Sequence, residues 1–434
     1  MQKVAVTLLG LGTVGTGVAR LLLEQADRLR RRSGLEFELR YVVVRDVDKD
    51  RGISLPKGTV LTSDPIRAVD DPDVHVVVEL WGGVESTYDV VCRALRNGKH
   101  VVTANKALLA EHGRELFRVA DESGSCLAFE ASVAGAIPIV GTLAHGLSAN
   151  RIQAIRGILN GTSNYILTQM AEQGHSYAEA LAEARRAGYA EANPTLDVDG
   201  TDAAQKLAIL TQLAFGTHVP LDRIHREGIT GIHQLDLQFA SELGYNVRLL
   251  AVARRSRDGI EIRVTPCLLR QHTPLAEVRG VYNAVEVEGD PAGRLFIHGL
   301  GAGGMATASA VVADLIDTAL GRAQVTFRML RMWAQQDDLP VVPPDQGESR
   351  FYYRFNVYDR PGVLAQIARV LGDHNVSIAS VIQHEPAPEQ TGSGLVPLVL
   401  MTHKARAQDA ITSLAEIDRL PVLAPPSVLL RVED

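Results

Sequence analysis

The densest group of ionisable side chains lies in the segment from residue 188 to residue 206. It holds four carboxylates followed by one lysine: Glu191, Asp197, Asp199, Asp202 and Lys206. Asp202 and Lys206 stand four residues apart at the start of a predicted helix, so they share one face of it. A lysine can move a proton to or from a reacting hydroxyl group, and the carboxylates can grip a cationic substrate. The same spacing also fits a solvated acidic loop with an ordinary salt bridge.

A second candidate site is the glycine-rich turn Gly10-Leu-Gly12-Thr13-Val14-Gly15. It follows a predicted buried strand over residues 4–9 and opens a predicted helix over residues 13–31. Glycines let the backbone approach a pyrophosphate, and the helix N-terminus supplies free N–H groups and the positive end of the helix dipole. The turn therefore predicts a dinucleotide site; the alternative is a turn that is merely flexible.

Arg45 bears on the choice of cofactor. It comes directly after the second predicted strand, where the NAD fingerprint expects an acidic residue, and Asp46 follows one position later. An arginine at this place can hold the 2′-phosphate of NADP. We therefore expect NADP; the alternative is that Arg45 is a surface residue and NAD is also used.

The elements around these sites predict three folded parts. Residues 1–135 alternate strand and helix patterns, which indicates an α/β dinucleotide-binding domain with a doubly wound parallel sheet. Residues 136–305 predict an α+β substrate-binding and dimerisation domain, and the helix in residues 306–322 is expected to pack back on the first domain. A proline-containing linker over 323–349 leads to residues 350–434, whose βαββαβ order predicts a ferredoxin-like unit.

Composition excludes several classes of protein. The net charge is −7 and no domain-scale basic run occurs, which argues against a nucleic-acid binder. No uninterrupted apolar stretch of about 20 residues predicts a membrane span. The three cysteines are scattered and form no CxxC pair, so neither a zinc site nor a disulfide framework is indicated. The first apolar run is short and glycine-rich, unlike a signal peptide, and we expect a cytoplasmic protein.

Four motifs together identify a resemblance. They are the run over residues 188–206, Gly157-Ile-Leu-Asn160-Gly-Thr-Ser-Asn-Tyr165, Thr103-Ala-Asn105-Lys106 and Gly301-Ala-Gly303-Gly-Met-Ala-Thr307. In their order along the chain, over about residues 1–320, these motifs resemble those of the homoserine dehydrogenases. The resemblance implies NAD(P)-dependent interconversion of L-homoserine and L-aspartate 4-semialdehyde, a step in threonine, methionine and isoleucine biosynthesis.

The resemblance also implies roles for single residues. Lys206 would be the proton donor in the reducing direction, and Lys106 would lie between nicotinamide and substrate. Glu191, Asp202 and Asp197 would bind the substrate. The cofactor would contact Gly10, Gly12, Thr13, Val14, Gly15, Arg45, Thr103, Lys106, Gly188 and Gly303. A sodium ion would be held by the Glu130 carboxylate and by the carbonyls of Val133, Gly135 and Ile137, which suit a hard cation.

The C-terminal unit resembles an ACT domain. The resemblance rests on the turn Asp359-Arg-Pro-Gly362 and on Asn375 before the next predicted strand. ACT domains are regulatory modules that pair across subunits and bind amino acids. This resemblance implies L-threonine as effector and a homodimer or homotetramer. The alternative is a dimerisation module that senses nothing.

Two other functions remain open from the sequence. One is a different amino-acid or semialdehyde reductase on the same scaffold, since fold does not fix function. That reading predicts an altered substrate loop, where only Asn193 departs from the family pattern. The other is a non-enzymatic sensor of a nucleotide or an amino acid, which predicts the loss of Lys206.

Overall fold

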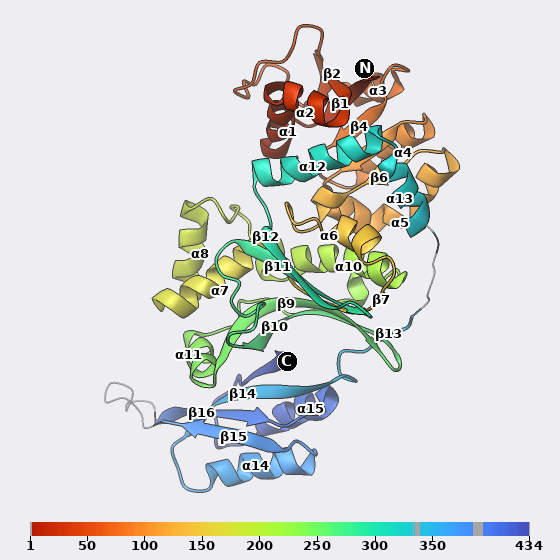
Figure 1. Ribbon diagram of the computed structural model, residues 1–434. Helices are drawn as coiled ribbons and strands as arrows, with labels where there is room; N and C mark the ends of the chain where they lie inside the picture. Colours follow the sequence, from red (N-terminus) through yellow and green to blue (C-terminus); the bar gives the residue numbers. More distant parts are fainter. Residues whose placement is uncertain (1, 333, 335–338, 385–393, 434) are drawn as a thin grey trace. The chain divides into compact units, whose positions relative to one another are not determined.

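The computed structural model describes residues 2–332, 334, 339–384 and 394–433 (Figure 1). The chain divides into two compact units. The first unit comprises Met1–Gly161, Asp202–Ile224 and Val281–Leu339. The second comprises Thr162–Thr201, His225–Gly280 and Pro340–Asp434. In the described part of the chain, no helix has the length and apolar character needed to cross a membrane.

The first unit contains a six-stranded sheet whose pairs are all parallel. Its order is β3-β2-β1-β4-β5-β6, so the order reverses between β1 and β4. Such reversals create the crevice where α/β sheets bind ligands. The apolar runs of the central strands are buried, as covering on both faces requires. The strands are β1 (Gln2–Leu9), β2 (Leu35–Val43), β3 (Val60–Thr62), β4 (Val76–Glu79), β5 (His100–Thr103) and β6 (Leu127–Ala128).

Helices connect and cover these strands, which confirms the predicted doubly wound sheet. They are α1 (Thr13–Glu24), α2 (Ala26–Ser33), α3 (Pro65–Asp70), α4 (Glu85–Arg96) and α5 (Lys106–Glu122). The single helix expected over residues 13–31 is two helices, α1 and α2. Helix α1 buries an apolar face, whereas α2 is rich in arginine and buries none of its residues. A change of direction at Gln25 therefore leaves the charged segment in solvent.

Helix α12 (Gly304–Ala319) returns to the first sheet from far along the chain. Its residues Val311 and Leu315 belong to the apolar cluster formed by β1 and α1. Helix α13 (Arg322–Leu330) follows, so part of the segment predicted as a linker over 323–349 is helical. Residues 333 and 335–338 of that segment lie outside the described residues.

A smaller antiparallel group completes the first unit. Strand β11 (Tyr282–Asp290) pairs with β7 (Arg151–Ile158) on one side and β12 (Gly293–Leu300) on the other. Strand β7 lies in the segment from about Ile137 to Gly216, for which the residue pattern of the sequence predicts mainly helices. Ile152, Ile155 and Ile158 are spaced by three residues, so they also fit one face of a helix. The longer helix of the group is α10 (Thr201–Phe215). The short elements are η1 (Glu130–Ser132), α6 (Ile139–Gly141), η2 (Thr142–Gly146) and η3 (Leu221–Arg223).

The second unit is built on one mixed sheet with the local order β9-β10-β18-β14-β16-β15. Its strands are β9 (Tyr245–Ser256), β10 (Gly259–Arg270), β14 (Glu348–Tyr358), β15 (Ile378–Gln383), β16 (Leu395–Thr402) and β18 (Val428–Glu433). The shorter β8 (His225–Arg226) and β13 (Val341–Val342) pair with β10, and β17 (Ala405–Arg406) pairs with β14. Its helices are α7 (Gly161–Gln173), α8 (Tyr177–Arg186), α9 (Thr195–Val198), α11 (Gln234–Glu242), α14 (Val363–Asp373) and α15 (Ala407–Ile417).

The C-terminal elements confirm the predicted ferredoxin-like order β14-α14-β15-β16-α15-β18. Phe351, Phe355 and Leu400 of this sheet pack with Ile367 of α14 and Ala410 of α15 in one apolar cluster. Strand β18 pairs with β14 and also, in parallel, with β10. The C-terminal strands therefore continue the sheet that begins with β9 and β10.

Candidate active site

The glycine-rich turn joins β1 to α1 at the carboxyl edge of the parallel sheet. Gly10 has a φ of +102°, and a Cβ on Gly15 would lie 2.1 Å from the Gly10 carbonyl oxygen, so both positions require glycine. A Cβ on Gly12 would meet nothing within 4 Å, which leaves that side of the turn open. The first N–H groups of α1, those of Thr13 and Val14, have no partner within the helix. The turn therefore has the geometry that suits a pyrophosphate.

Helix α12 begins beside this turn. Its N-cap, Gly303, has a φ of +126°. A Cβ on Gly304 would lie 2.8 Å from Cγ2 of Thr13, and a Cβ on Gly17 would lie 2.9 Å from that of Ala308. Because these residues are small, α1 and α12 approach closely. The structure thus places Thr13 beside the start of α12, whose N-cap is Gly303.

Two further predicted cofactor residues lie at the same edge of the sheet. The Gly10 N–H donates to the Val43 carbonyl at the end of β2, 2.9 Å away. Exposed Arg45 follows two residues later. Thr103 is the buried last residue of β5. Both therefore stand where a dinucleotide crosses a sheet of this kind.

A buried carboxylate, Glu79 at the end of β4, links two loops of this edge. It accepts hydrogen bonds from the Thr103 hydroxyl at 2.5 Å and from the amides of residues 81 and 82 at 3.2 and 3.1 Å. Burial raises the pKa of Glu79, and these hydrogen bonds act against the rise. The Thr103 hydroxyl in turn accepts the N–H of Asn105, the N-cap of α5. Glu79 therefore helps to set where α5, and with it Lys106, begins.

Lys206, on the buried helix α10, lies at the centre of a polar cluster in the first unit. Its Nζ donates to Oδ2 of Asp202 at 2.7 Å and to the carbonyl of Leu159 at 2.6 Å. Asn160 donates to the same Oδ2 of Asp202 at 2.9 Å. Oδ1 of Asp202 pairs with Nζ of Lys106 at 3.0 Å. The expected placement of Asp202 and Lys206 on one face of a helix is confirmed, and one carboxylate contacts both lysines.

Electrostatics keep this carboxylate ionised. Burial alone would raise the pKa of Asp202, but the charges of Lys206 and Lys106, with hydrogen bonds from Lys206 and Asn160, hold it well below its ordinary value. The side chain of Lys206 is 11% exposed and that of Lys106 38%. The cluster can thus hold one proton-carrying group away from bulk water and a second cation near its edge.

Asn283 on β11 supports the cluster from behind and was not predicted. It is fully buried, and its Nδ2 donates to the Leu159 carbonyl that also receives Lys206, at 3.0 Å. A Cβ on Gly301 would lie 2.0 Å from Cγ of Asn283, so the Gly301 backbone rests on this amide. The signal in the sequence was an asparagine inside an apolar strand. Asn160 belongs to the motif over residues 157–165, but that motif did not predict its hydrogen bond to Asp202.

The remaining predicted substrate and cofactor residues belong to the second unit. Gly188 has a φ of +76° and follows α8. Glu191 is exposed in the loop before α9. Asp197 is half-buried in α9, and its backbone carbonyl accepts the Ser163 hydroxyl at 2.8 Å. The proposed contacts of these three residues with substrate and cofactor remain predictions.

The residues predicted to hold sodium form a compact loop in the first unit. The Glu130 carboxylate accepts the N–H groups of Val140 and Gly141, both at 2.8 Å. Positive φ angles at Ala134 and Gly135 fold the segment tightly. Each carboxylate oxygen keeps capacity beyond its one hydrogen bond, and burial raises the pKa of Glu130. The carbonyl of Ile137 already accepts the Ile139 N–H at 2.8 Å. A sodium ion at this loop stays a prediction.

Comparison with family models covers most of the chain. A model described as "Homoserine dehydrogenase, NAD binding domain" matches residues 10–130, and "Homoserine dehydrogenase" matches residues 138–316. A model described as "ACT domain" matches residues 354–421. The three matches follow the order of the predicted parts.

Curated relatives and solved structures agree with these models. A homoserine dehydrogenase of Pseudomonas aeruginosa is 43% identical over all of this chain and 99% of its own length, and one of Neisseria gonorrhoeae is 42% identical over 100% and 99%. The crystal structure of a Thiobacillus denitrificans homoserine dehydrogenase has a TM-score of 0.91 and 41% identity, covering 100% of this chain and 99% of its own. A hyperthermophilic archaeal homoserine dehydrogenase in complex with NADPH has a TM-score of 0.63 and 29% identity, covering 74% and 98%.

Proposed function

This chain belongs to the homoserine dehydrogenase family. We propose that Lys206 transfers the proton of the reaction, and that Asp202 and Lys106 assist it by positioning and by charge. The enzyme interconverts L-homoserine and L-aspartate 4-semialdehyde in amino-acid biosynthesis and is an NAD(P)-dependent oxidoreductase. The observation that carries the proposal is the Asp202 carboxylate bound between two lysines.

Each residue of this cluster has a separate role in the proposed reaction. Nicotinamide, when bound, supplies or accepts the hydride. In the reducing direction Lys206 gives its proton to the aldehyde oxygen as that oxygen becomes a hydroxyl. The Leu159 carbonyl and Asp202 hold the ammonium of Lys206 in place. Asp202 also orients Lys106, whose positive charge favours the negative charge that develops on the oxygen.

The other assignments extend this proposal. Glu191 and Asp197 bind the substrate, with carboxylates suited to its ammonium group. Gly10, Gly12, Thr13, Val14 and Gly15 hold the pyrophosphate, while Arg45 selects NADP by pairing with the 2′-phosphate. The remaining cofactor contacts are Thr103, Lys106, Gly188 and Gly303. The NADPH complex of the archaeal relative supports a cofactor of this kind.

Sodium and regulation complete the proposal. Glu130 with the carbonyls of Val133, Gly135 and Ile137 holds a sodium ion that stiffens this loop. The C-terminal domain, matched as an ACT domain, binds an amino-acid effector, for which L-threonine is our proposal, and joins subunits into a homodimer or homotetramer. The division at 1–135, 136–305, 323–349 and 350–434, and the cytoplasmic location, stay predictions.

A comparison of substrates distinguishes this reaction from that of another reductase on the same scaffold. We would measure reduction of NADP⁺ with L-homoserine, L-serine and L-threonine, and oxidation of NADPH with L-aspartate 4-semialdehyde. The proposal expects turnover with L-homoserine and the semialdehyde and little with the other two alcohols. Faster turnover of L-serine or L-threonine would support a different amino-acid dehydrogenase.

A further inference from the structure

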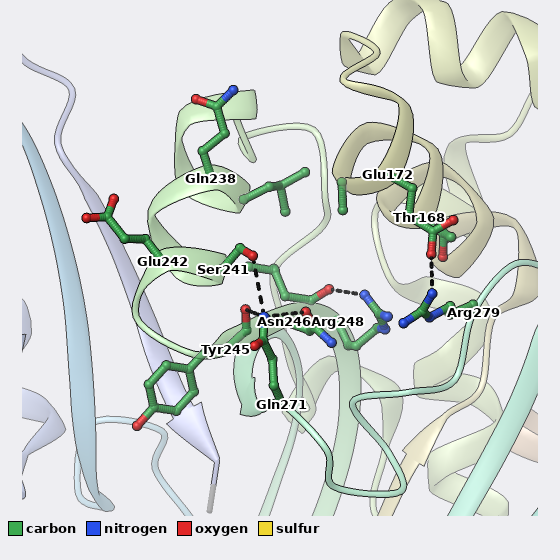
Figure 2. Close-up of a pocket in the computed structure, with 13 residues that line it drawn as sticks. Thr168, Glu172, Gln238, Ser241, Glu242, Tyr245, Asn246, Arg248, Gln271 and Arg279 are labelled. Atoms are coloured by element: carbon green, nitrogen blue, oxygen red, sulfur yellow. Dashed lines mark hydrogen bonds and ion pairs between the residues drawn. The ribbon is translucent and has the colours of Figure 1, made fainter.

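A cavity of about 520 Å³ is lined by residues of the second unit alone, none of which belongs to the cluster around Lys206 (Figure 2). Small-molecule sites occupy about 300–1,000 Å³. Helix α7, helix α11, strand β9 and the segment after β10 form its walls. The polar residues that line it are Thr168, Glu172, Gln238, Ser241, Glu242, Tyr245, Asn246, Arg248, Gln271 and Arg279.

Arg248 is the unusual residue of this lining. It is 4% exposed, yet its acceptors are main-chain carbonyls: those of Val278, Val247 and Ala276, at 3.0, 2.9 and 2.9 Å. Among the described residues, no carboxylate lies within ion-pair distance of it. Burial, and then the charge of Arg279, lower the pKa of Arg248 to about 10, so it remains a cation at neutral pH. A desolvated guanidinium without an anionic partner is costly.

The guanidinium keeps donors for a further partner. It carries five N–H groups, and the three carbonyls take one each from Nε, Nη1 and Nη2. One N–H on each terminal nitrogen is therefore left over. Arginine with two available N–H groups matches a carboxylate.

Two carboxylates, those of Glu172 and Glu242, add negative charge to the lining of the cavity. Glu172, on α7, pairs with Arg279 at 3.0 Å (Figure 2), and its side chain is 40% exposed. Glu242, at the end of α11, is exposed as well. The amide of Gln271 makes three contacts of 3.4 Å each, to Ser241, Tyr245 and Asn246, long enough to yield to a better partner. Both charges and several neutral donors and acceptors thus face one cavity.

We propose that this cavity binds a free α-amino acid, with its carboxylate on Arg248 and its ammonium toward Glu172. A zwitterion matches both charges of the wall, which a purely apolar or purely anionic ligand does not. The site goes beyond the dehydrogenase reaction and does not depend on it.

Helix α11 gives the cavity a fixed wall. Its buried Asp236 pairs with Arg354 of β14 at 2.6 Å and accepts the Tyr352 hydroxyl at 3.2 Å. Phe239 of the same helix stacks on His384, with ring centroids 5.7 Å apart. A ligand held against α11 would therefore contact the helix that is tied to strand β14 by the ion pair of Asp236 with Arg354.

Calorimetric titration of the full chain with each of the common L-α-amino acids tests the proposal. Any that binds is then compared with its carboxamide and with acetate. We expect at least one amino acid to bind, and its carboxamide and acetate to bind at least tenfold more weakly. Absence of binding by every amino acid at millimolar concentration overturns the proposal. Acetate binding as tightly as the amino acid reduces the site to a general anion site and overturns the assignment.

Variants then locate the ligand. Arg248→Gln removes the cation and is expected to weaken binding roughly 10- to 100-fold, since hydrogen bonds between charged groups are involved. Arg257→Gln makes the same charge change in the exposed turn after β9 and should leave binding unchanged. If Arg248→Gln does not fold, Ser241→Trp, which leaves Arg248 itself in place, is expected to fill the cavity and abolish binding. Binding that survives in the folded variants places the ligand elsewhere and overturns the proposal.

Discussion

Neutralising Asp202 is the perturbation whose consequences the structure defines best. Asp202→Asn keeps the shape of the side chain and can keep one hydrogen bond. It removes the negative charge that stands 2.7 Å from Lys206 and 3.0 Å from Lys106. The two lysines would then lose the carboxylate that compensates their charges.

The magnitude follows from burial. Removing one partner of a buried ion pair costs about 3–5 kcal/mol. The side chain of Lys206 is 11% exposed, so the cost of leaving its charge uncompensated falls in this range. The side chain of Lys106 is 38% exposed, so water can solvate its charge and its contribution is smaller. We therefore expect a loss of roughly 3 kcal/mol in the free energy of unfolding. For catalysis, loss of the group that orients Lys206 should lower kcat roughly 100-fold or more.

The assay combines steady-state oxidation of NADPH by L-aspartate 4-semialdehyde with thermal unfolding. Asp222→Asn, which changes an exposed carboxylate of the same unit, is the matched control and should behave as the unaltered enzyme. A variant at Asp202 that keeps both its kcat and its melting temperature would refute the reasoning, because the carboxylate would then neither compensate the lysines nor hold the proton donor.

Three further predictions concern residues around this centre. Asn283→Ala leaves the Leu159 carbonyl with one donor fewer. We expect kcat to fall and the pH–rate profile to shift while the KM for NADPH stays constant. A variant that loses stability but keeps its kinetics would make Asn283 merely structural. Arg45→Ala should raise the KM for NADPH roughly tenfold, as loss of a charged hydrogen bond implies, and leave that for NADH unchanged; equal effects on both cofactors would contradict the role of Arg45. Burial raises the pKa of Glu130 above its ordinary 4.5, so ionising it costs stability as pH rises from 4.5 through the raised value. Sodium, compared with potassium at equal ionic strength, should therefore raise the melting temperature more at neutral than at acidic pH, and Glu130→Gln should abolish the difference; a sodium effect that survives the substitution would place the ion elsewhere.

The sequence predicted the elements whose pattern is local. The alternation of buried strands and helices up to residue 135, and the βαββαβ order at the C-terminus, carry periodicities that survive in the structure. Strand β7 was missed because its isoleucines are spaced as on a helix. The pairing of β18 with β10 joins residues more than 160 positions apart, which no local pattern reveals.

The candidate site shows the same division. The pair of Asp202 and Lys206 follows from a four-residue spacing on one helix. Its second lysine, Lys106, and the two asparagines that steady it come from distant segments. Chain folding alone brings them together, so only the resemblance to a family suggested Lys106, and nothing suggested the contact of Asn283.

The central claim is that Lys206 supplies the proton. Its most direct test is a single-turnover measurement of NADPH oxidation with saturating L-aspartate 4-semialdehyde, comparing the unaltered chain with Lys206→Ala after NADPH binding has been shown to be intact in both. The account predicts that the rate in the variant falls by roughly 100- to 10,000-fold, the range of a lost general acid. A variant that binds NADPH and turns over at the unaltered rate would contradict it.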